Sequence, residues 1–370
     1  MRLSTPVYLL SYATLAISSA IPPRDEASSS RARAEQATQK ISPLSIQITS
    51  LDHTQVQAVI TNNGDTSLRL LREGTILDAA PVEKLLLHGQ NNARVPFSGI
   101  RKSIKYHNLP DSAFTSLAAG SNITVNVELA SLHDLTSGGE FSVLSLGHIP
   151  IATGDNNDIS GSVAFNSNKL AIKVDGKRAA HSFAAVVRTP ASAVAQDCTG
   201  DHLKAVKAAH DSCAWLATLA AAQALSGDAK KFEEHFGTQD AAARKTVHDR
   251  YIAVATECAA ATDKAKTTVH CTDPDNYCND STLAFTLSAL DSITYCPSFF
   301  TALKPLEKAC HSQDQTTTAV HEYTHADIIF KPGTQDLAYG YANDVALGSA
   351  ERLLNADSYG MFVNAIWSGC

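Results

Sequence analysis

The sequence predicts an α+β protein in which a mainly β domain precedes a mainly α-helical domain that contains disulfides. Three observations lead to this prediction: windows of β-branched residues before residue 176, helical periodicity after Cys198, and eight cysteines that all lie beyond residue 197. The chain has 370 residues, which is longer than a typical single domain. We therefore expect two folded units behind a leader.

The N-terminus is typical of a secreted protein. Arg2 precedes an apolar stretch, and Ser18 and Ala20 satisfy a small-x-small cleavage rule. Residues 1–20 are therefore predicted to be a signal peptide, and residues 21–42, rich in Ser, Ala, Arg, Glu and Gln, a linker. No later apolar run approaches the roughly 20 residues that cross a bilayer, so no membrane partner is expected.

Strand signals begin near Ile41. The windows SIQITS, TQVQAVI, ITVNVELA and EFSVLSL alternate or cluster β-branched residues, and turn signals such as NNGD and SGGE separate them. Residues 43–176 are therefore predicted to form a mainly β domain, which has no cysteine.

The character of the chain changes at a dibasic pair, Lys177-Arg178. Residues 1–188 carry a net charge of +2 and residues 189–370 a net charge of −9. The segment 177–188 is poor in packing signals, and Arg188 offers a second basic site. Because charge, cysteine content and secondary structure all change here, we predict proteolytic processing after Arg178 or Arg188. The acidic half argues against a nucleic-acid partner and favours basic polypeptides.

Helical periodicity begins after Cys198. Ala-rich stretches at 201–225 and 239–262 place apolar residues three and four positions apart. Two further helices are expected, at about 315–328 and from about 345 into the C-terminus, whereas residues 263–300 are rich in turn signals.

The cysteines predict a disulfide framework. Their even number, the absence of a CxxC pair and the signal peptide favour disulfides over a structural zinc ribbon. The sequence alone leaves the pairing open. The cysteines are Cys198, Cys213, Cys258, Cys271, Cys278, Cys296, Cys310 and Cys370.

The segment HEYTH predicts a catalytic metal site. On a helix, His321 and His325 lie one turn apart on the same face and can present two imidazoles to one ion. Zinc suits imidazole and accepts a tetrahedral site with one position left for water. Glu322 is placed to take a proton from that water and deliver it to a leaving amine.

A third ligand is required, and the residues leave two candidates. A metzincin would need Gly at 328 and His at 331, but Ile328 and Lys331 stand there, so that class is excluded. A gluzincin would use a Glu on a following helix, and Glu351 is available. The other candidate is Asp336, which follows His321 by fifteen residues in GTQDLAYGYAND.

Here the sequence resembles the fungal deuterolysins, also called neutral protease 2, of the aspzincin family. The resemblance rests on HExxH followed by GTxxDxxYG and extends to the preproprotein layout and the cysteine spacing. One departure is Tyr323, where many relatives have Met. The matching residues are His321, Glu322, His325, Gly333, Thr334, Asp336, Tyr339 and Gly340.

The resemblance implies a zincin-type catalytic domain at residues 189–370 and one zinc ion per chain. It assigns His321, His325 and Asp336 as ligands, and Glu322 as the general base. Tyr339 matches the tyrosine that is thought to stabilise the oxyanion. Asp357 matches an acidic substrate-binding position, so its replacement is expected to change substrate choice with zinc retained.

The family's cysteine pattern implies the pairs Cys198–Cys271, Cys278–Cys296 and Cys310–Cys370, and leaves Cys213 with Cys258. Residues 21–188 then correspond to a propeptide that assists folding and inhibits the enzyme until its removal. The expected product is a secreted monomeric zinc endopeptidase that acts on proteins and peptides, with basic proteins such as histones and protamines favoured. Asn122 and Asn279 head N-glycosylation sequons.

A second hypothesis comes from a different functional class. The chain could be a secreted, disulfide-rich binding protein that keeps a helical metal motif without catalysis. Hydrolysis that disappears in a Glu322→Ala variant, with folding and zinc content intact, separates the two hypotheses.

Overall fold

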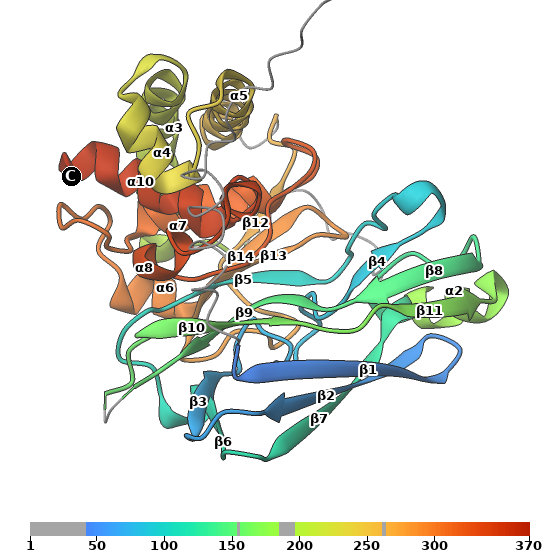
Figure 1. Cartoon of the computed structure of the whole chain (residues 1–370). Coiled ribbons are helices and arrows are strands. Elements are labelled where there is room, and N and C mark those ends of the chain that lie inside the picture. Colours follow the sequence, from blue (N-terminus) through green and yellow to red (C-terminus); the bar gives the residue numbers. More distant parts are fainter. Residues whose placement is uncertain (1–41, 154–155, 185–196, 261–263) are drawn as a thin grey trace, which may run out of the picture. The chain divides into compact units, whose positions relative to one another are not determined.

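The computed structural model describes residues 42–153, 156–184, 197–260 and 264–370. The predicted signal peptide, the linker before residue 42 and Arg188 lie outside these ranges. Ser42–Cys370 forms one compact unit with the expected mixture of strands and helices (Figure 1).

Three antiparallel sheets make up most of the N-terminal half, as the strand windows predict. Along β1 the side chains of Leu44, Ile46 and Ile48 are buried while their neighbours are exposed, which is the period of two that a half-buried strand requires. The sheet orders are β1-β2-β7, β10-β9-β3-β6 and β11-β8-β4. Their bounds are β1 Leu44–Asp52, β2 Gln55–Asn62, β3 Leu68–Leu71, β4 Leu86–His88, β6 Phe114–Leu117, β7 Asn122–Glu128, β8 Gly139–Leu144, β9 Leu146–Ile151, β10 Gly161–Asn166 and β11 Leu170–Val174, with short 3-10 turns at Gln90–Asn92, Asp111–Ala113 and Leu129–Ser131.

The dibasic pair lies in a helix, α2 (Gly176–Ala184), and not in a segment without packing. The Asp175 carboxylate accepts the Lys177 N–H at 2.9 Å and so starts the helix. This capping residue is visible in the sequence, but the prediction for residues 177–188 did not take it into account. Ala179 is fully buried, while Lys177 and Arg178 stay exposed. Arg178 pairs with Asp52 at the surface.

Helices dominate the C-terminal half. The two long predicted helices are present, and the last one begins at Ala356, later than expected, because two four-residue helices precede it. The turn-rich region 263–300 holds three strands and a helix, which are too short for periodicity to reveal. The elements are α3 Gly200–Ser226, α4 Ala229–Phe236, α5 Ala241–Cys258, β12 Thr268–His270, β13 Thr282–Leu287, β14 Ser292–Tyr295, α6 Pro297–Ala302, α7 Gln315–His325, α8 Tyr341–Asp344, α9 Ser349–Arg352 and α10 Ala356–Ser368.

A fourth sheet joins the two halves of the sequence. Its order is β12-β14-β13-β5, and β5 (Ile100–Ile104) comes from the N-terminal half (Figure 1). β5 runs antiparallel to β13, with Lys102 opposite Phe285 and Ile100 opposite Leu287. The strand windows seen in the sequence do not include residues 100–104, so β5 was not predicted.

Helix α7 is buried along its whole length, between α3, α10, β13 and β5. A capping box fixes its start: the Asp314 carboxylate accepts the Thr317 N–H at 2.7 Å, and the Thr317 hydroxyl accepts the Asp314 N–H at 2.9 Å. Such a cap contributes about 1 kcal/mol. The helix that carries HEYTH is therefore held at a fixed position in the core.

All eight cysteines form disulfides, in the pairs that the family pattern implies. The pairs are Cys198–Cys271, Cys213–Cys258, Cys278–Cys296 and Cys310–Cys370.

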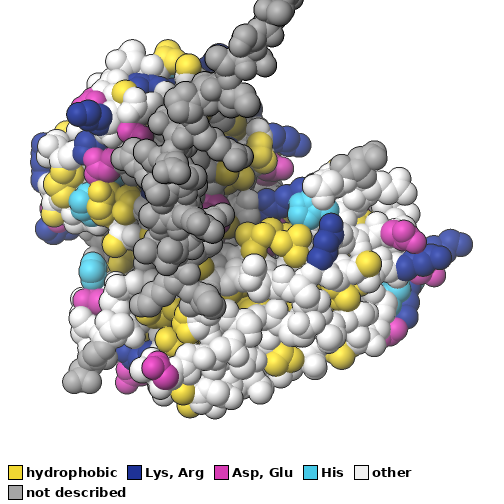
Figure 2. All heavy atoms as spheres, viewed as in Figure 1, with side chains coloured by type: hydrophobic (Ala, Val, Ile, Leu, Met, Phe, Trp, Pro, Cys, Tyr) yellow, Lys and Arg dark blue, Asp and Glu magenta, His cyan; other side chains and the backbone are white. Residues whose placement is uncertain are grey.

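Within the described ranges, no helix combines the length and apolar character that a bilayer span needs. On the face shown in Figure 2, acidic and basic side chains are interspersed and do not form one large patch of a single sign.

Candidate metal centre

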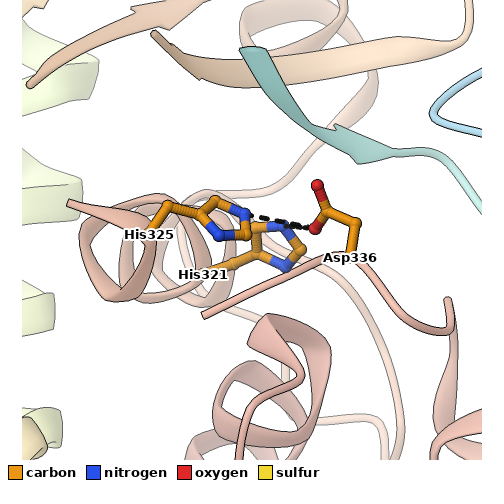
Figure 3. A group of neighbouring side chains, drawn as sticks. All are labelled: His321, His325 and Asp336. Atoms are coloured by element: carbon orange, nitrogen blue, oxygen red, sulfur yellow. Dashed lines mark ion pairs between the residues drawn. The ribbon is translucent and has the colours of Figure 1, made fainter. Parts of the chain in front are cut away.

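Helix α7 and the loop that follows it bring three donor side chains together. The Nε2 atoms of His321 and His325 each lie 3.1 Å from Oδ1 of Asp336 (Figure 3). The two imidazoles come from consecutive turns of one helix, as the spacing of four residues predicts. Among the residues that the structure describes, these three form the group of His, Cys, Asp or Glu side chains close enough to share an ion, with ligand atoms within 4.8 Å of one another.

The donor atoms have the chemistry of a zinc site. Nε2 of both histidines and Oδ1 of Asp336 are buried and have no hydrogen-bond partner of their own. Leaving such atoms unpaired costs free energy unless a ligand satisfies them. Two imidazole nitrogens and one carboxylate oxygen are the donor types of a catalytic zinc site with an open fourth position. The residues present therefore fit a zinc ion.

Hydrogen bonds on the far side of each ring fix the orientation of the two histidines. Nδ1 of His321 lies 2.8 Å from Oδ1 of Asp357, and Nδ1 of His325 lies 3.0 Å from the carbonyl oxygen of Thr334. With the proton on Nδ1, each Nε2 presents its lone pair toward Asp336 and the shared point. Such outer partners raise the basicity of a ligating imidazole and fix its tautomer.

The loop that carries Asp336 is held by hydrogen bonds to the start of α10. The Asn355 side-chain oxygen accepts the N–H groups of Leu337 at 2.9 Å and Ala338 at 3.1 Å. The Gln335 carbonyl accepts the Ala356 N–H at 2.9 Å. These bonds flank Asp336 on both sides, so its carboxylate reaches the histidines from a rigid loop.

Charges within the site shift the ionisation of its groups. Burial alone would raise the pKa of Asp336, but the two imidazoles hold that pKa well below its usual range. Burial would likewise lower the pKa of His321, yet the neighbouring carboxylates of Asp336 and Asp357 raise it well above its usual value. For His325, burial prevails over the attraction of Asp336 and lowers the pKa. Asp336 is thus an anion ready to bind a cation.

Glu322 lies beside the donor group on the same helix. One of its carboxylate oxygens accepts the Thr286 hydroxyl of β13 at 2.7 Å, while the other is buried without a hydrogen-bond partner. Burial raises the pKa of Glu322 to about 8. A carboxylate with a raised proton affinity and one free oxygen can both take up and release a proton near neutral pH.

Tyr339 and Glu351 have different surroundings. The Tyr339 hydroxyl is buried and donates to the carbonyl oxygen of Lys102 at 2.9 Å. Glu351 lies on α9, where its carboxylate accepts the Gly348 N–H at 2.9 Å and closes its own helix start. It is not part of the three-residue donor group.

Asp357 lies behind His321. Its Oδ1 accepts from His321, and its Oδ2 accepts the Gly340 N–H at 2.7 Å and the hydroxyl of Tyr106. Tyr323, the departure from the family pattern, points into the core and its hydroxyl lies 3.2 Å from Nε2 of His210. That contact keeps it away from the donor atoms, as helical geometry predicts.

Several residues that support the site were not predicted. Thr286 and Arg250 lie far from HEYTH in sequence, and no local signal marks them. The buried Arg250 guanidinium donates to the carbonyl of Pro332 at 2.8 Å and to that of Thr324 at 3.3 Å, which ties the end of α7 to the Asp336 loop. Thr334 had a signal, because it belongs to the matched GTxxD segment.

Comparisons with known sequences identify the family of the chain. The sequence model described as the Deuterolysin metalloprotease (M35) family matches residues 14–370. The chain is 40% identical over 330 residues to a Neutral protease 2 homolog of Phaeosphaeria nodorum, covering 89% of this chain and 92% of that protein. It is 39% identical over 328 residues to Neutral protease 2 of Aspergillus oryzae, covering 88% and 92%.

Proposed function

The chain belongs to the deuterolysin metalloprotease (M35) family and is a metalloendopeptidase; on that premise we propose that it is a secreted, zinc-dependent endopeptidase made as a zymogen. One observation carries the proposal. Three buried donor atoms without hydrogen-bond partners converge beside the buried carboxylate of Glu322.

His321, His325 and Asp336 are the proposed zinc ligands. The chemistry that zinc supplies when bound in such a site is Lewis acidity toward a peptide carbonyl and a water molecule. Asp336 contributes one negative charge, and the two histidines are neutral donors whose orientation Asp357 and Thr334 fix.

Glu322 is the proposed general base and acid. Its free oxygen can accept a proton from the attacking water, while the bond from Thr286 holds the other oxygen in place. The same carboxyl can then give that proton to the leaving amide nitrogen, because burial keeps its proton affinity high.

Tyr339 is the proposed oxyanion donor. Its hydroxyl already donates to a backbone carbonyl, that of Lys102. A phenol fixed in this direction can stabilise the negative charge that develops on a carbonyl oxygen during attack.

Residues 1–20 are the proposed signal peptide, residues 21–188 the propeptide and residues 189–370 the catalytic domain. Four disulfides fit an oxidising, extracellular setting. The exposed Lys177-Arg178 pair supports processing there, although a helix must first unwind.

The −9 charge of residues 189–370 supports a preference for basic proteins such as histones and protamines. The mature enzyme is proposed to act as a monomer, and the exposed Asn122 and Asn279 are proposed glycosylation sites.

The protein purified from culture medium is expected to hold one zinc per chain, to begin after Arg178 or Arg188, and to hydrolyse protamine faster than an acidic protein. A chelator should abolish hydrolysis and added zinc should restore it, because the ligands stay in the folded chain. Mass spectrometry, metal analysis and a hydrolysis assay measure these properties. A processed protein without zinc and without hydrolysis would instead favour the non-catalytic binding protein.

Asp357→Asn is expected to lower zinc affinity by about 10–100-fold, because the change removes the anion that polarises His321. Equilibrium competition with a chromogenic chelator measures this loss. Glu351→Gln is the matched control and should bind zinc like the unchanged chain. If Asp357→Asn keeps its zinc affinity and alters only substrate choice, the substrate-binding role implied by the family resemblance is favoured.

A further inference from the structure

We propose that β5 of the N-terminal domain occupies the peptide-binding groove of its own chain, with the Lys102–Ser103 peptide bond at the position of a scissile bond. This inference rests on the proposed function, and it names the segment, the register and the direction in which the site binds a peptide.

The first argument is the way β5 binds the catalytic half. β5 adds to the sheet as an antiparallel neighbour of β13, the strand that also supplies Thr286 to Glu322. Beyond β5, the Lys105 N–H donates to the Ser281 carbonyl at 2.9 Å, and the Ser288 N–H donates to the Gly99 carbonyl at 2.9 Å. Addition of a strand to a sheet edge is a general way to bind an extended peptide whatever its sequence.

The second argument is the position of one peptide bond. The Lys102 carbonyl accepts from the Tyr339 hydroxyl, the proposed oxyanion donor, at 2.9 Å. The next residue, Ser103, lines a small pocket together with His321 and Asp357. A peptide carbonyl held at the oxyanion donor is what hydrolysis of a bound peptide requires. The Lys102 N–H also donates to Oδ2 of Asp336 at 2.9 Å.

The third argument concerns the residues after this bond. The Gln313 side chain donates to the Ile104 carbonyl at 2.8 Å and accepts the Tyr106 N–H at 3.1 Å. The Tyr106 hydroxyl donates to Asp357, which itself holds His321. Gln313 thus binds backbone groups that any extended peptide offers. A small pocket beside Ser103 is lined in part by Thr318, Asp357 and Met361, and would receive the side chain that follows the scissile bond.

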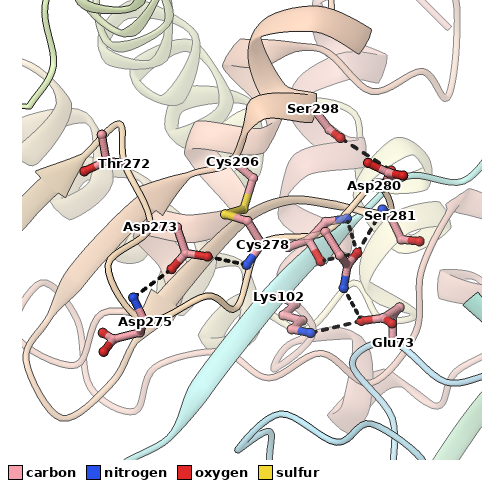
Figure 4. Close-up of a disulfide and its surroundings, with 12 residues drawn as sticks. Glu73, Lys102, Thr272, Asp273, Asp275, Cys278, Asp280, Ser281, Cys296 and Ser298 are labelled. Atoms are coloured by element: carbon pink, nitrogen blue, oxygen red, sulfur yellow. Dashed lines mark hydrogen bonds and ion pairs between the residues drawn. A yellow bond between two sulfur atoms is a disulfide. The ribbon is translucent and has the colours of Figure 1, made fainter.

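The Lys102 side chain anchors the strand to the N-terminal domain instead of to the catalytic half. This side chain is 1% exposed, and its ammonium group lies 3.0 Å from Glu73 and 2.8 Å from Asp78 (Figure 4 shows Glu73). Glu73 also accepts from the Asn279 side chain at 2.9 Å, next to the Cys278–Cys296 disulfide. The adjacent Gly74 lies so close to the site that an added Cβ would stand 2.4 Å from the Tyr339 hydroxyl oxygen.

These contacts explain how a domain without cysteine can inhibit the site. The strand fills the groove, and the covalent link keeps its effective concentration high. The buried ion pairs hold Lys102 and Gln313 holds the Ile104 carbonyl, so both sides of the Lys102–Ser103 bond stay bound. Hydrolysis of that bond would consume one water and leave a carboxyl group on Lys102 and an amino group on Ser103.

The test uses the full chain with Lys177, Arg178 and Arg188 replaced by Ala, so that the N-terminal domain stays attached. In this parent, Lys102→Met is expected to raise hydrolysis of a short fluorogenic peptide by at least about tenfold, because Glu73 and Asp78 lose their partner, so the strand can be cut in the groove and then leave it. Mass spectrometry should also detect a new N-terminus at Ser103, and the same variant with Glu322→Gln should not produce it.

Arg69→Met is the control, because it removes an ion pair of similar length but at the surface, with Asp111 at 2.8 Å, from the same domain. It should remain as inactive as the parent. If Lys102→Met folds and stays inactive while normally processed enzyme is active, the inference is wrong and the proposed function stands. If processed enzyme also fails to hydrolyse peptides, the proposed function itself is wrong.

Hydrogen exchange on the chain that keeps Lys102 tests the inference even if the Lys102→Met variant fails to fold. With Glu322→Gln present to prevent hydrolysis, the amides of β13 should exchange slowly in the intact chain and faster after processing and removal of the N-terminal domain. A synthetic peptide of residues 98–108 should restore protection of β13, and a scrambled peptide should not. Equal protection of β13 before and after removal would overturn the inference.

Discussion

Replacing Glu322 with Gln is expected to lower kcat for peptide hydrolysis by about 10²–10⁴-fold, the usual contribution of a general base. The amide keeps the size of the side chain and can still accept from the Thr286 hydroxyl, but it cannot take a proton from water. Bound zinc should remain at one per chain, because Glu322 is not among the three converging donors. Steady-state kinetics and metal analysis of the processed enzyme measure both quantities.

Glu351→Gln is the appropriate control for the Glu322 variant. It makes the same chemical change on a helix outside the donor group, so activity should be unchanged. Full activity in Glu322→Gln would mean that another group transfers the proton, and the mechanism proposed for this site would have to be abandoned.

Replacing Asp336 with Ala is expected to remove zinc and activity together. The change takes away the negatively charged donor that lies 3.1 Å from both imidazoles. Loss of a residue that only hydrogen-bonds to a ligand typically lowers zinc affinity by about 10–100-fold, and loss of the ligand itself should lower it further. Zinc content after dialysis against a weak chelator measures the loss, and circular dichroism verifies that the chain stays folded.

The same measurement on Glu351→Ala separates the two classes of third ligand. Zinc should stay bound in this variant, since the Glu351 carboxylate is engaged at the start of its own helix. Loss of zinc from Glu351→Ala together with retention in Asp336→Ala would support a gluzincin site and overturn the ligand set proposed here.

Periodicity predicted the long elements well and the short ones poorly. The strands β1, β2 and β7 and the helices α3 and α5 have enough residues for a repeat to show. Helices of four residues, such as α8 and α9, and the three-residue strand β12 do not. The segment with Lys177-Arg178 was misjudged because its helix depends on one cap, the Asp175 carboxylate, and on burial of Ala179.

The chemistry of the site was readable in part because its ligands are close in sequence. A spacing of four residues on a helix is enough to place His321 beside His325 and to set Glu322 next to them. Asp336 needed the family resemblance, because geometry along the chain could not choose between it and Glu351. Its position against the two imidazoles depends on Asn355, a loop contact that no local pattern encodes.

By itself, the sequence determined the two-part α+β organisation, the HEYTH helix and the types of side chain that could bind a metal. These follow from local rules, namely period, spacing and side-chain chemistry. Only the tertiary structure decided that Asp357 supports His321 and that β5 pairs with β13 across the site. The reason is physical: these contacts join residues 36 and roughly 180 positions apart, and the backbone of a strand can pair with any exposed edge. Which edge it meets depends on how the whole chain packs.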